Sequence, residues 1–376
     1  MTASASRSPF TGRVLDSALD AIGNTPMIRM DRIAKAYGLK CNLYGKVEYF
    51  NAGGSVKDRM ALTMLEVAEK EGTLIPGKSV LVEPSAGNTG AALAMMARLK
   101  GYRCIIVMPA RMSADKDILL HAFGAEVVRT PDPTPCLVAV TKHLVELIPN
   151  AVLLNQFTNP NNPLAHERTT APEMIAAIES TIGGDRPTSG KIDVFCSAGA
   201  TGGTLTGVAR ALRRDHNPEL KVIACDPTGS ILAQPDSLND PSAPISLEGT
   251  GLKFVPESFD RSCVSHWIKV KDSDGYDATL EIHRYEALLV GGSSGAAIAG
   301  LMKYLKSEEG WKEVGGVEGK NVVVLLPDGI RNYMTQGWFT DSFADAADSP
   351  YASQINAALD AVKDQYVSQR YLQPGR

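Results

Sequence analysis

A lysine follows a glycine-rich segment near the start of the chain. Residues 51–59 read NAGGSVKDR, and apolar residues at three- and four-residue spacing begin directly after them. We therefore expect a turn that places Lys57 at the start of a helix beginning near Asp58. The positive end of the helix dipole lowers the pKa of an ammonium group, as an imine-forming amine requires. Lys57 is thus a candidate catalytic amine, although a solvated loop lysine fits the same local pattern.

Two further segments combine glycine with small hydroxyl residues between an apolar strand and a helix. Residues 83–90 read EPSAGNTG, and residues 197–204 read SAGATGGT. Main-chain N–H groups at a helix N-terminus bind anions, so the first segment suits a carboxylate and the second suits a phosphate. The second segment has neither the glycine spacing of a dinucleotide-binding loop nor the lysine of a P-loop.

A fourth segment, GGSSG at 291–295, follows a short apolar run, and its simplest interpretation is a helix N-cap. The other three segments supply an amine, a carboxylate-binding loop and a phosphate-binding loop. Together these predict a site for pyridoxal 5'-phosphate better than four unrelated loops do.

The elements that must position these segments alternate along the chain. Short β-rich runs are separated by stretches with helical spacing of apolar residues, which predicts an α/β fold with parallel-rich sheets flanked by helices. The predicted strands are 79–82, 104–108, 126–129, 152–154, 192–196, 222–225 and 322–326, and the clearest predicted helices are 60–71, 90–99, 203–213 and 296–305.

Composition narrows the class of protein. The chain has 376 residues, 44% of them hydrophobic, and a net charge of -4 with both signs interspersed. We therefore expect no nucleic-acid partner and no membrane partner. No run of about 18 apolar residues occurs, so a cytoplasmic protein is expected. The six cysteines are scattered without a C-x-x-C pair, which predicts reduced thiols and no metal site.

From about residue 19 to about residue 335 the chain resembles the fold type II pyridoxal phosphate enzymes, specifically the cysteine synthase and cystathionine β-synthase family. The resemblance includes IGNTP at 22–26, NQF at 155–157 and NPLAH at 162–166. The stretches GYRCIIVMP at 101–109, DPTGSILA at 226–233 and RNYM at 331–334 look closer to the catalytic core of cystathionine β-synthase.

The resemblance implies a two-lobed architecture similar to tryptophan synthase β. The smaller, mobile α/β lobe would comprise residues 39–156. The larger α/β lobe would comprise residues 1–38 and 157–340, and residues 341–376 would form a C-terminal helical tail. A homodimer is also implied.

The resemblance assigns roles to individual residues. Lys57 would hold the cofactor as a Schiff base and remove the α-proton, Asn88 would bind the phenolic oxygen, and Ser293 would face the pyridine nitrogen. The phosphate would be held by Gly199, Ala200, Thr201, Gly202, Gly203 and Thr204. The amino-acid substrate would be bound by Ser85, Ala86, Gly87, Asn88, Thr89, Gln156, Gly249 and Leu252.

Three neighbouring residues receive structural interpretations. We expect His166 to pack or cap within the 162–170 turn, and Asp58 and Arg59 to form a local ion pair. No cysteine and histidine precede Cys41, so no haem is expected.

The implied reaction is β-replacement on serine or an O-activated serine through an aminoacrylate, with a thiol or another small nucleophile. Ala86, Ala200, Leu252 and Gly329 depart from the family pattern and favour an altered second substrate, with Gly329 widening the region near the ring. Three alternatives stay open: a specialised-pathway synthase of an unusual amino acid, a β-eliminating serine or threonine dehydratase, and a non-catalytic scaffold.

Overall fold

The computed structural model describes residues 14–85, 87–110, 112, 114–131, 134–343 and 351–362. The chain divides into two units, residues 1–332 and residues 333–376. The first unit contains both β-sheets and all the predicted site residues.

The larger sheet of the first unit has six strands in the order β1-β2-β10-β7-β8-β9. Neighbouring strands run parallel except for β1 and β2, which pair antiparallel. Central strand β10 is buried along its whole length, as expected for a parallel strand covered on both faces. The bounds are β1 Met27–Arg29, β2 Asn42–Val47, β7 Val194–Ala198, β8 Lys221–Pro227, β9 His266–Val270 and β10 Asn321–Leu326.

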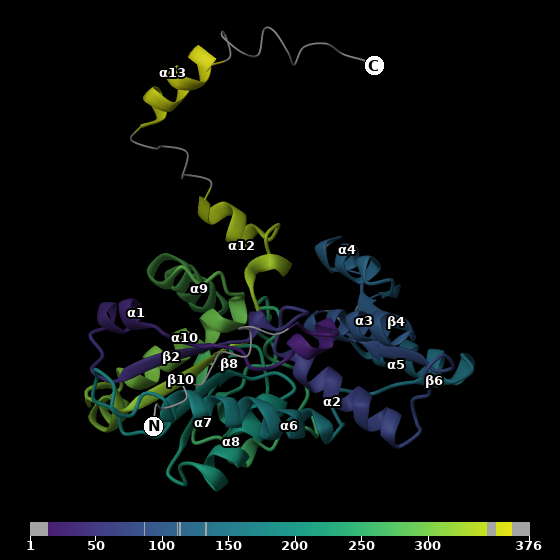
Figure 1. The fold of residues 1–376 in the computed structure, drawn as a ribbon, viewed down its shortest axis with the longest axis horizontal. Coiled ribbons are helices and arrows are strands. Elements are labelled where there is room, and N and C mark those ends of the chain that lie inside the picture. The colour runs from purple at the N-terminus through teal and green to yellow at the C-terminus, as the bar shows by residue number, and fades with distance from the viewer. Residues whose placement is uncertain are drawn as a thin grey trace. The chain divides into compact units, whose positions relative to one another are not determined.

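Helices cover both faces of this sheet, and a separate hydrophobic core lies under each set (Figure 1). One core joins the sheet to α1 (Asp31–Ala36), α9 (Asp272–Glu286) and α10 (Gly292–Leu305). The opposite core joins it to α7 (Ala171–Glu179) and α8 (Gly203–Asp215).

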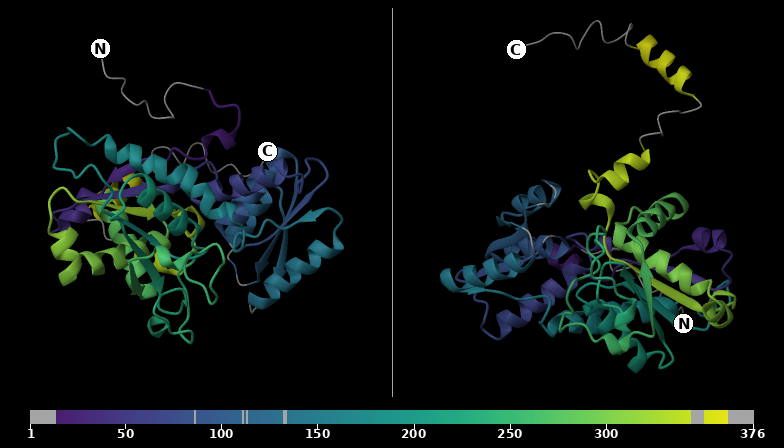
Figure 2. Two further views of the ribbon diagram at one scale, coloured as in Figure 1. Left: turned by 90° about the horizontal axis from the view of Figure 1, so that it is seen from below. Right: turned by 180° about the vertical axis from the view of Figure 1, so that it is seen from behind.

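The smaller sheet has four parallel strands in the order β5-β4-β3-β6 and lies beside the larger one (Figure 2). Its two faces also carry separate cores, one under α2 and α3 and the other under α5. The strands are β3 Val80–Pro84, β4 Arg103–Pro109, β5 Glu126–Thr130 and β6 Ala151–Val152. The helices around it are α2 Lys57–Lys70, α3 Asn88–Lys100, α4 Ala114–Ala122, α5 Thr134–Leu147 and α6 Asn161–Ala165.

Short helical segments connect these elements. In the first unit they are η1 Ala18–Ala21, η2 Glu48–Phe50, the π-helical turn η3 His166–Thr170, η4 Asp236–Leu238, η5 Arg261–Cys263, α11 Glu308–Gly310, η6 Trp311–Gly315 and η7 Ile330–Asn332. The second unit contains α12 Gly337–Thr340, η8 Asp341–Phe343 and α13 Ala352–Val362.

The predicted α/β fold with parallel-rich sheets is confirmed, and each of the seven predicted strands has a counterpart. Strands β1, β2 and β9 have no predicted counterpart. Strand β2 lies within the predicted smaller lobe, 39–156, yet it pairs with β1 and β10 of the larger sheet. The division into a mobile and a larger lobe stays a prediction, as does the part of the tail outside the described residues.

Two observations bear on the expected environment. Five cysteines, Cys41, Cys104, Cys196, Cys225 and Cys263, are free and buried, which agrees with the expected reduced thiols. Within the described part of the chain, no helix has the length and apolar character needed to cross a membrane.

Candidate active site

Lys57 is the first residue of α2 and follows a tight turn. Gly54 occupies this turn with a φ of +89°, a conformation that suits glycine. The Lys57 N–H donates to Ser55 Oγ at 3.2 Å, which ties the lysine to the turn. Desolvation lowers the pKa of the Lys57 ammonium group to about 8, and the Asp328 carboxylate acts in the opposite direction. A neutral, nucleophilic fraction of the amine is therefore present near neutral pH.

A buried group of charged side chains holds the start of α2. Arg59 donates from Nε to Glu48 Oε2 at 2.6 Å and from Nη2 to Glu173 Oε2 at 2.7 Å. Lys46 Nζ donates to the same Glu173 oxygen at 2.6 Å. The predicted local ion pair between Asp58 and Arg59 is wrong, because Arg59 reaches these two carboxylates instead. Asp58 Oδ2 accepts from a main-chain N–H of the lysine turn at 2.7 Å.

The segment 83–90 joins the carboxyl end of β3 to α3, as predicted. Ser85 Oγ accepts from the Gly90 N–H at 2.9 Å, so its hydroxyl lies over the first turn of the helix. Thr89 Oγ1 donates to Gln156 Oε1 at 2.7 Å. The structure thus brings the Ser85 and Thr89 hydroxyls and the Gln156 amide to one helix N-terminus, where the dipole favours a carboxylate.

Gly87 and Asn88, at the N-terminus of α3, have different surroundings. Gly87 is the N-cap of α3, and no atom lies within 4 Å of the position that a Cβ would take. Asn88 follows, and its amide is held at both ends: Nδ2 donates to Asp328 Oδ2 at 2.7 Å and Oδ1 accepts from Asn332 Nδ2 at 2.9 Å. Ala86, also predicted to bind substrate, lies outside the described residues.

The segment 197–204 joins β7 to α8 and presents main-chain donors. Among the described residues, the N–H groups of residues 203–205 meet no acceptor; the first bond of this turn runs from the Thr206 N–H to the Gly202 carbonyl at 2.9 Å. Donors at the positive end of a helix form an anion site. The geometry is that expected of a phosphate cradle.

Close packing fixes the shape of this loop. Gly202 has a φ of +77°, and a Cβ there would lie 1.9 Å from Phe259 Cγ. A Cβ at Gly203 would lie 1.9 Å from Asn162 Oδ1. Asn162 Nδ2 also donates to Thr201 Oγ1 at 3.2 Å. Only glycine fits at both positions, and the Thr201 hydroxyl is held in place.

His166 supports the same loop from the π-helical turn η3. Its Nε2 lies 3.2 Å from Thr204 Oγ1, and its Nδ1 lies 2.9 Å from Thr170 Oγ1. Burial, with the positive charges of Arg59 and Lys57, lowers the pKa of His166 to about 3. The ring is therefore neutral near pH 7, and its contact with Thr170 agrees with the expected packing role.

Ser293 lies in the first turn of α10 with 4% of its surface exposed. Its hydroxyl makes no hydrogen bond to any described residue, and the N-cap of this helix is Gly291, without a side-chain cap. The segment 327–330 connects this region to the lysine turn, because Pro327 O accepts from the Val56 N–H at 2.8 Å and Asp328 O accepts from the Gly291 N–H at 3.1 Å.

Gly329, predicted to widen the region near the ring, lies against Tyr49 and Leu289. A Cβ at this position would lie 3.3 Å from Tyr49 Cβ and 3.3 Å from the Leu289 carbonyl oxygen. A side chain here would meet these two residues, and the widening near the cofactor ring stays a prediction.

The loop that carries Gly249 and Leu252 contacts the phosphate cradle. Gly249 has a φ of +79°, and Thr250 Oγ1 donates to the Gly199 carbonyl at 2.9 Å. Leu252 is half-buried and packs against the core under α8. Ala200, which follows Gly199, is also half-buried. Both departures from the family pattern thus lie beside the cradle.

This donor set fits pyridoxal phosphate. The α8 N-terminus offers free N–H groups to the phosphate, and Lys57 offers an amine to the aldehyde. Asn88 offers an amide to the phenolic oxygen, and the buried Ser293 hydroxyl is without a partner in the described structure. The phosphate cradle and Asn88 follow the carboxyl ends of the parallel strands β7 and β3, where α/β proteins bind ligands. Sequence reasoning missed Asp328, which contacts Asn88 and acts on Lys57.

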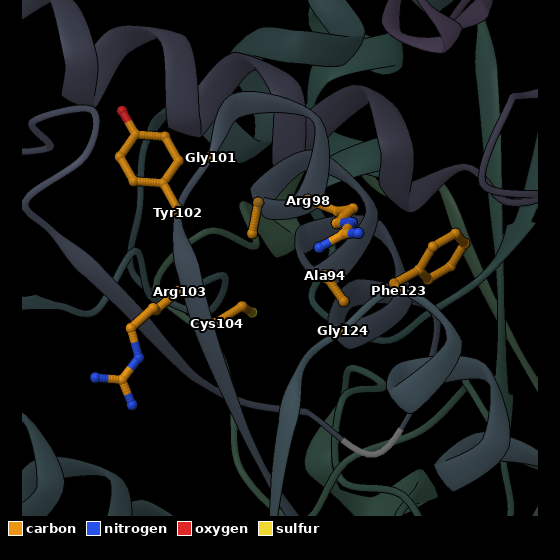
Figure 3. A pocket seen from close by; sticks show the side chains of 9 residues that line it. Ala94, Arg98, Gly101, Tyr102, Arg103, Cys104, Phe123 and Gly124 are labelled. Carbon is orange, nitrogen blue, oxygen red and sulfur yellow. The ribbon is translucent and has the colours of Figure 1, made fainter.

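A surface pocket of about 210 Å³ lies elsewhere, between α3, β4 and the end of α4 (Figure 3). It is lined by Ala94, Ala97, Arg98, Gly101, Tyr102, Arg103, Cys104, Phe123 and Gly124. None of these residues belongs to the loops described above, so the pocket plays no part in the site.

Comparison with known sequences decides the family. The profile of the family described as "Pyridoxal-phosphate dependent enzyme" matches residues 18–328. The chain belongs to this family. The predicted pyridoxal phosphate cofactor and fold type II architecture are therefore confirmed.

Individual members of the pyridoxal-phosphate dependent enzyme family resemble most of the chain. It is 44% identical to cystathionine beta-synthase of Rattus norvegicus over 330 residues, 86% of this chain and 55% of that protein. It is 36% identical to cysteine synthase 3 of Caenorhabditis elegans over 90% of this chain and 94% of that protein. The solved structure of O-acetylserine dependent cystathionine beta-synthase from Helicobacter pylori matches with a TM-score of 0.76 at 31% identity. The match covers 87% of this chain and 100% of that one. The chain thus spans little more than half of the rat enzyme.

Proposed function

We propose that this protein catalyses pyridoxal phosphate-dependent β-replacement on serine or an O-activated serine, with a thiol or another small nucleophile as the second substrate. The observation that carries the proposal is the position of Lys57. Burial lowers the pKa of its amine to about 8, and the Asp328 carboxylate, which acts in the opposite direction, accepts from Nδ2 of Asn88, the first residue of α3. The similarity to cystathionine beta-synthase and cysteine synthase 3 supports the same reaction class.

The side chains around α3 bind and orient the amino acid in this proposal. Ser85, Thr89 and Gln156 hold its α-carboxylate, and the α3 N-terminus adds main-chain donors and a favourable dipole. Holding the carboxylate fixes the position of Cα relative to Lys57. Lys57 Nζ then accepts the α-proton and later returns it.

When bound, pyridoxal phosphate withdraws electrons from Cα and so makes the α-proton removable and the β-substituent expellable. Ser293 offers the ring nitrogen a neutral hydroxyl, and a hydroxyl does not hold that nitrogen protonated as a carboxylate would. The weaker electron withdrawal favours loss of a β-substituent over transamination.

The test of the reaction is product formation by the purified full chain. We would supply L-serine, O-acetyl-L-serine or O-phospho-L-serine with sulfide or homocysteine, follow the cofactor absorbance, and identify products by mass spectrometry. A new β-substituted amino acid that needs both donor and nucleophile is the expected result. Keto-acid release without a nucleophile would identify a β-eliminating dehydratase instead. The absence of a cofactor absorbance band would favour the non-catalytic scaffold.

The role of Lys57 is tested by Lys57→Ala. Removing a general base typically costs about 10²- to 10⁴-fold in turnover, and we expect at least that loss. Lys70→Ala, at the exposed end of the same helix, is the matched control and should keep wild-type turnover. Equal activity of the two variants would contradict the assignment.

We further propose a homodimer in the cytoplasm. The dimer rests on the resemblance to the cysteine synthase and cystathionine β-synthase family, and the location rests on five free, buried thiols, since disulfides are rare in the cytosol. Sedimentation as a monomer would refute the first, and recovery from a secreted or periplasmic fraction would refute the second.

A further inference from the structure

Glu83 is a buried carboxylate that binds the main chain of a distant turn. It belongs to β3, two residues before Ser85, and has 1% of its surface exposed. Its Oε2 accepts from the Asn155 N–H at 3.0 Å, and its Oε1 accepts from the Gln156 N–H at 3.1 Å. Burial raises the pKa of Glu83 to about 7, while these N–H groups and that of Leu154 act in the opposite direction. The N–H donors thus favour the ionised form of the carboxyl group.

The turn that Glu83 binds is irregular and depends on such contacts. Asn155 has a φ of +57°, in the left-handed region that few side chains adopt. The next residue, Gln156, has 6% of its surface exposed and lies at a junction. Its side chain accepts from Thr89 in the carboxylate-binding loop, and its carbonyl accepts from Asn162 Nδ2 at 2.8 Å.

Asn162 carries the connection onward, because the same Nδ2 donates to Thr201 in the phosphate cradle. The Ser258 hydroxyl, which has one proton, donates to the Thr201 carbonyl at 2.8 Å and lies 3.3 Å from the Gln156 carbonyl. The Gln156 main chain therefore contacts residues that support the phosphate cradle through its carbonyl, and Glu83 through its N–H group.

We propose that Glu83 is a positioning residue that sets the substrate-carboxylate site by fixing the Gln156 main chain against the Ser85 loop. Glu83 contacts neither substrate nor cofactor; it acts through Gln156. The proposal rests on the proposed assignment of Gln156 to the substrate carboxylate. It predicts that a change at Glu83 alters substrate binding before it alters cofactor binding.

Glu83→Gln tests this directly, because a carboxamide offers one acceptor oxygen and turns an NH₂ group toward the other N–H. The probe is L-alanine, which has no β-substituent to lose, and its dissociation constant is read from the cofactor absorbance of the holoenzyme. We expect that constant to rise about tenfold, the effect of losing one hydrogen bond to a charged group, with the cofactor still bound. Gln156→Ala should give a rise of similar size.

A double variant separates positioning from general destabilisation. If Glu83 acts through Gln156, Glu83→Gln should add little to the effect of Gln156→Ala, since coupled residues are not additive. The matched control is Asp193→Asn, which removes another buried carboxylate that accepts from the Asn321 N–H at 2.8 Å on the larger sheet. It should lower thermal stability and leave the L-alanine constant unchanged.

Each outcome decides a separate point. A wild-type L-alanine constant in Glu83→Gln, or fully additive effects, overturns the proposal for Glu83. If Gln156→Ala also leaves the L-alanine dissociation constant unchanged, the assignment of Gln156 to the substrate carboxylate is refuted. Absence of β-replacement by the wild type, with the L-alanine effects intact, refutes the reaction but leaves the positioning role standing.

If Glu83→Gln does not fold, two measurements replace it. Glu83→Asp keeps the charge on a shorter side chain and should weaken L-alanine binding in the same direction. Hydrogen exchange of the wild-type peptide 154–159 should be slow, because the Asn155 and Gln156 N–H groups donate to a buried carboxylate. Exchange as fast as in an open loop would overturn the proposal.

Discussion

Replacing Gly202 by alanine isolates the contribution of the phosphate cradle. An alanine at a φ of +77° costs about 1–2 kcal/mol in backbone strain. Its Cβ would lie 1.9 Å from Phe259 Cγ, so the loop or the ring must move, and overpacking of this kind costs about 1–3 kcal/mol. If the loop relaxes by moving away, it loses the arrangement that presents its N–H groups. The sum, about 2–5 kcal/mol, then raises the cofactor dissociation constant at least about 30-fold.

The assay is a titration of cofactor-free protein with pyridoxal phosphate, followed by absorbance. Gly38→Ala is the matched control, because Gly38 has a φ of +68° but no atom within 4 Å of the position that a Cβ would take. The Gly38→Ala variant introduces the backbone strain without a steric clash, and the position lies outside the site. The cofactor affinity of this variant should therefore equal that of the wild type. Wild-type affinity in Gly202→Ala, or an equal loss in both variants, would refute the reasoning.

Three further substitutions probe the electrostatics of the site. Asp328→Asn removes the charge that raises the pKa of Lys57, so cofactor attachment should reach half its maximal rate below about pH 8, as stopped-flow absorbance can show. Arg59→Met strands the buried Glu48 carboxylate and should cost about 3–5 kcal/mol in urea unfolding. Burial raises the pKa of Glu48, but the charge of Arg59 outweighs burial and lowers that pKa to about 2. The stability that the Arg59–Glu48 pair contributes is therefore present above pH 4.5 and is lost as the pH falls toward 2. His166→Phe removes the partner of the cradle hydroxyl and should weaken cofactor binding about fivefold in the same titration, whereas an unchanged constant would contradict that contact.

The fold could be predicted where burial leaves a local pattern. Residues 322–326 form a continuous apolar run because β10 is buried on both faces. Strand β2 was missed because it contains Gly45 and Lys46. A Cβ at Gly45 would lie 2.7 Å from Leu326 Cδ1, and the charge of the buried Lys46 is paired with Glu173 at 2.6 Å. Both explanations depend on residues more than a hundred positions away, which no local pattern reveals.

The site divides in the same way. The glycine-rich loops could be predicted because a strand, a turn and a helix N-terminus are consecutive in the sequence. Asp328 could not, since it meets Asn88 only after β10 has entered the larger sheet. Asn162 supports Thr201 through a side-chain contact 39 positions apart, and nothing in the NPLAH motif itself indicates that bond. Position at the carboxyl end of an apolar strand was the one available signal for Asp328.

The place of β10 between β2 and β7 also constrains the order in which the chain can fold. A ribosome that has released residues 42–198 has produced both neighbours of β10, but the strand that joins them is still about 130 residues from completion. Until then β2 and β7 each keep an unpaired edge, which is a hazard for association with other chains. Lys57 likewise lacks Asp328 throughout this interval. Pairing of both edges, and the contact of Asp328 with Asn88, is therefore completed only late in biogenesis.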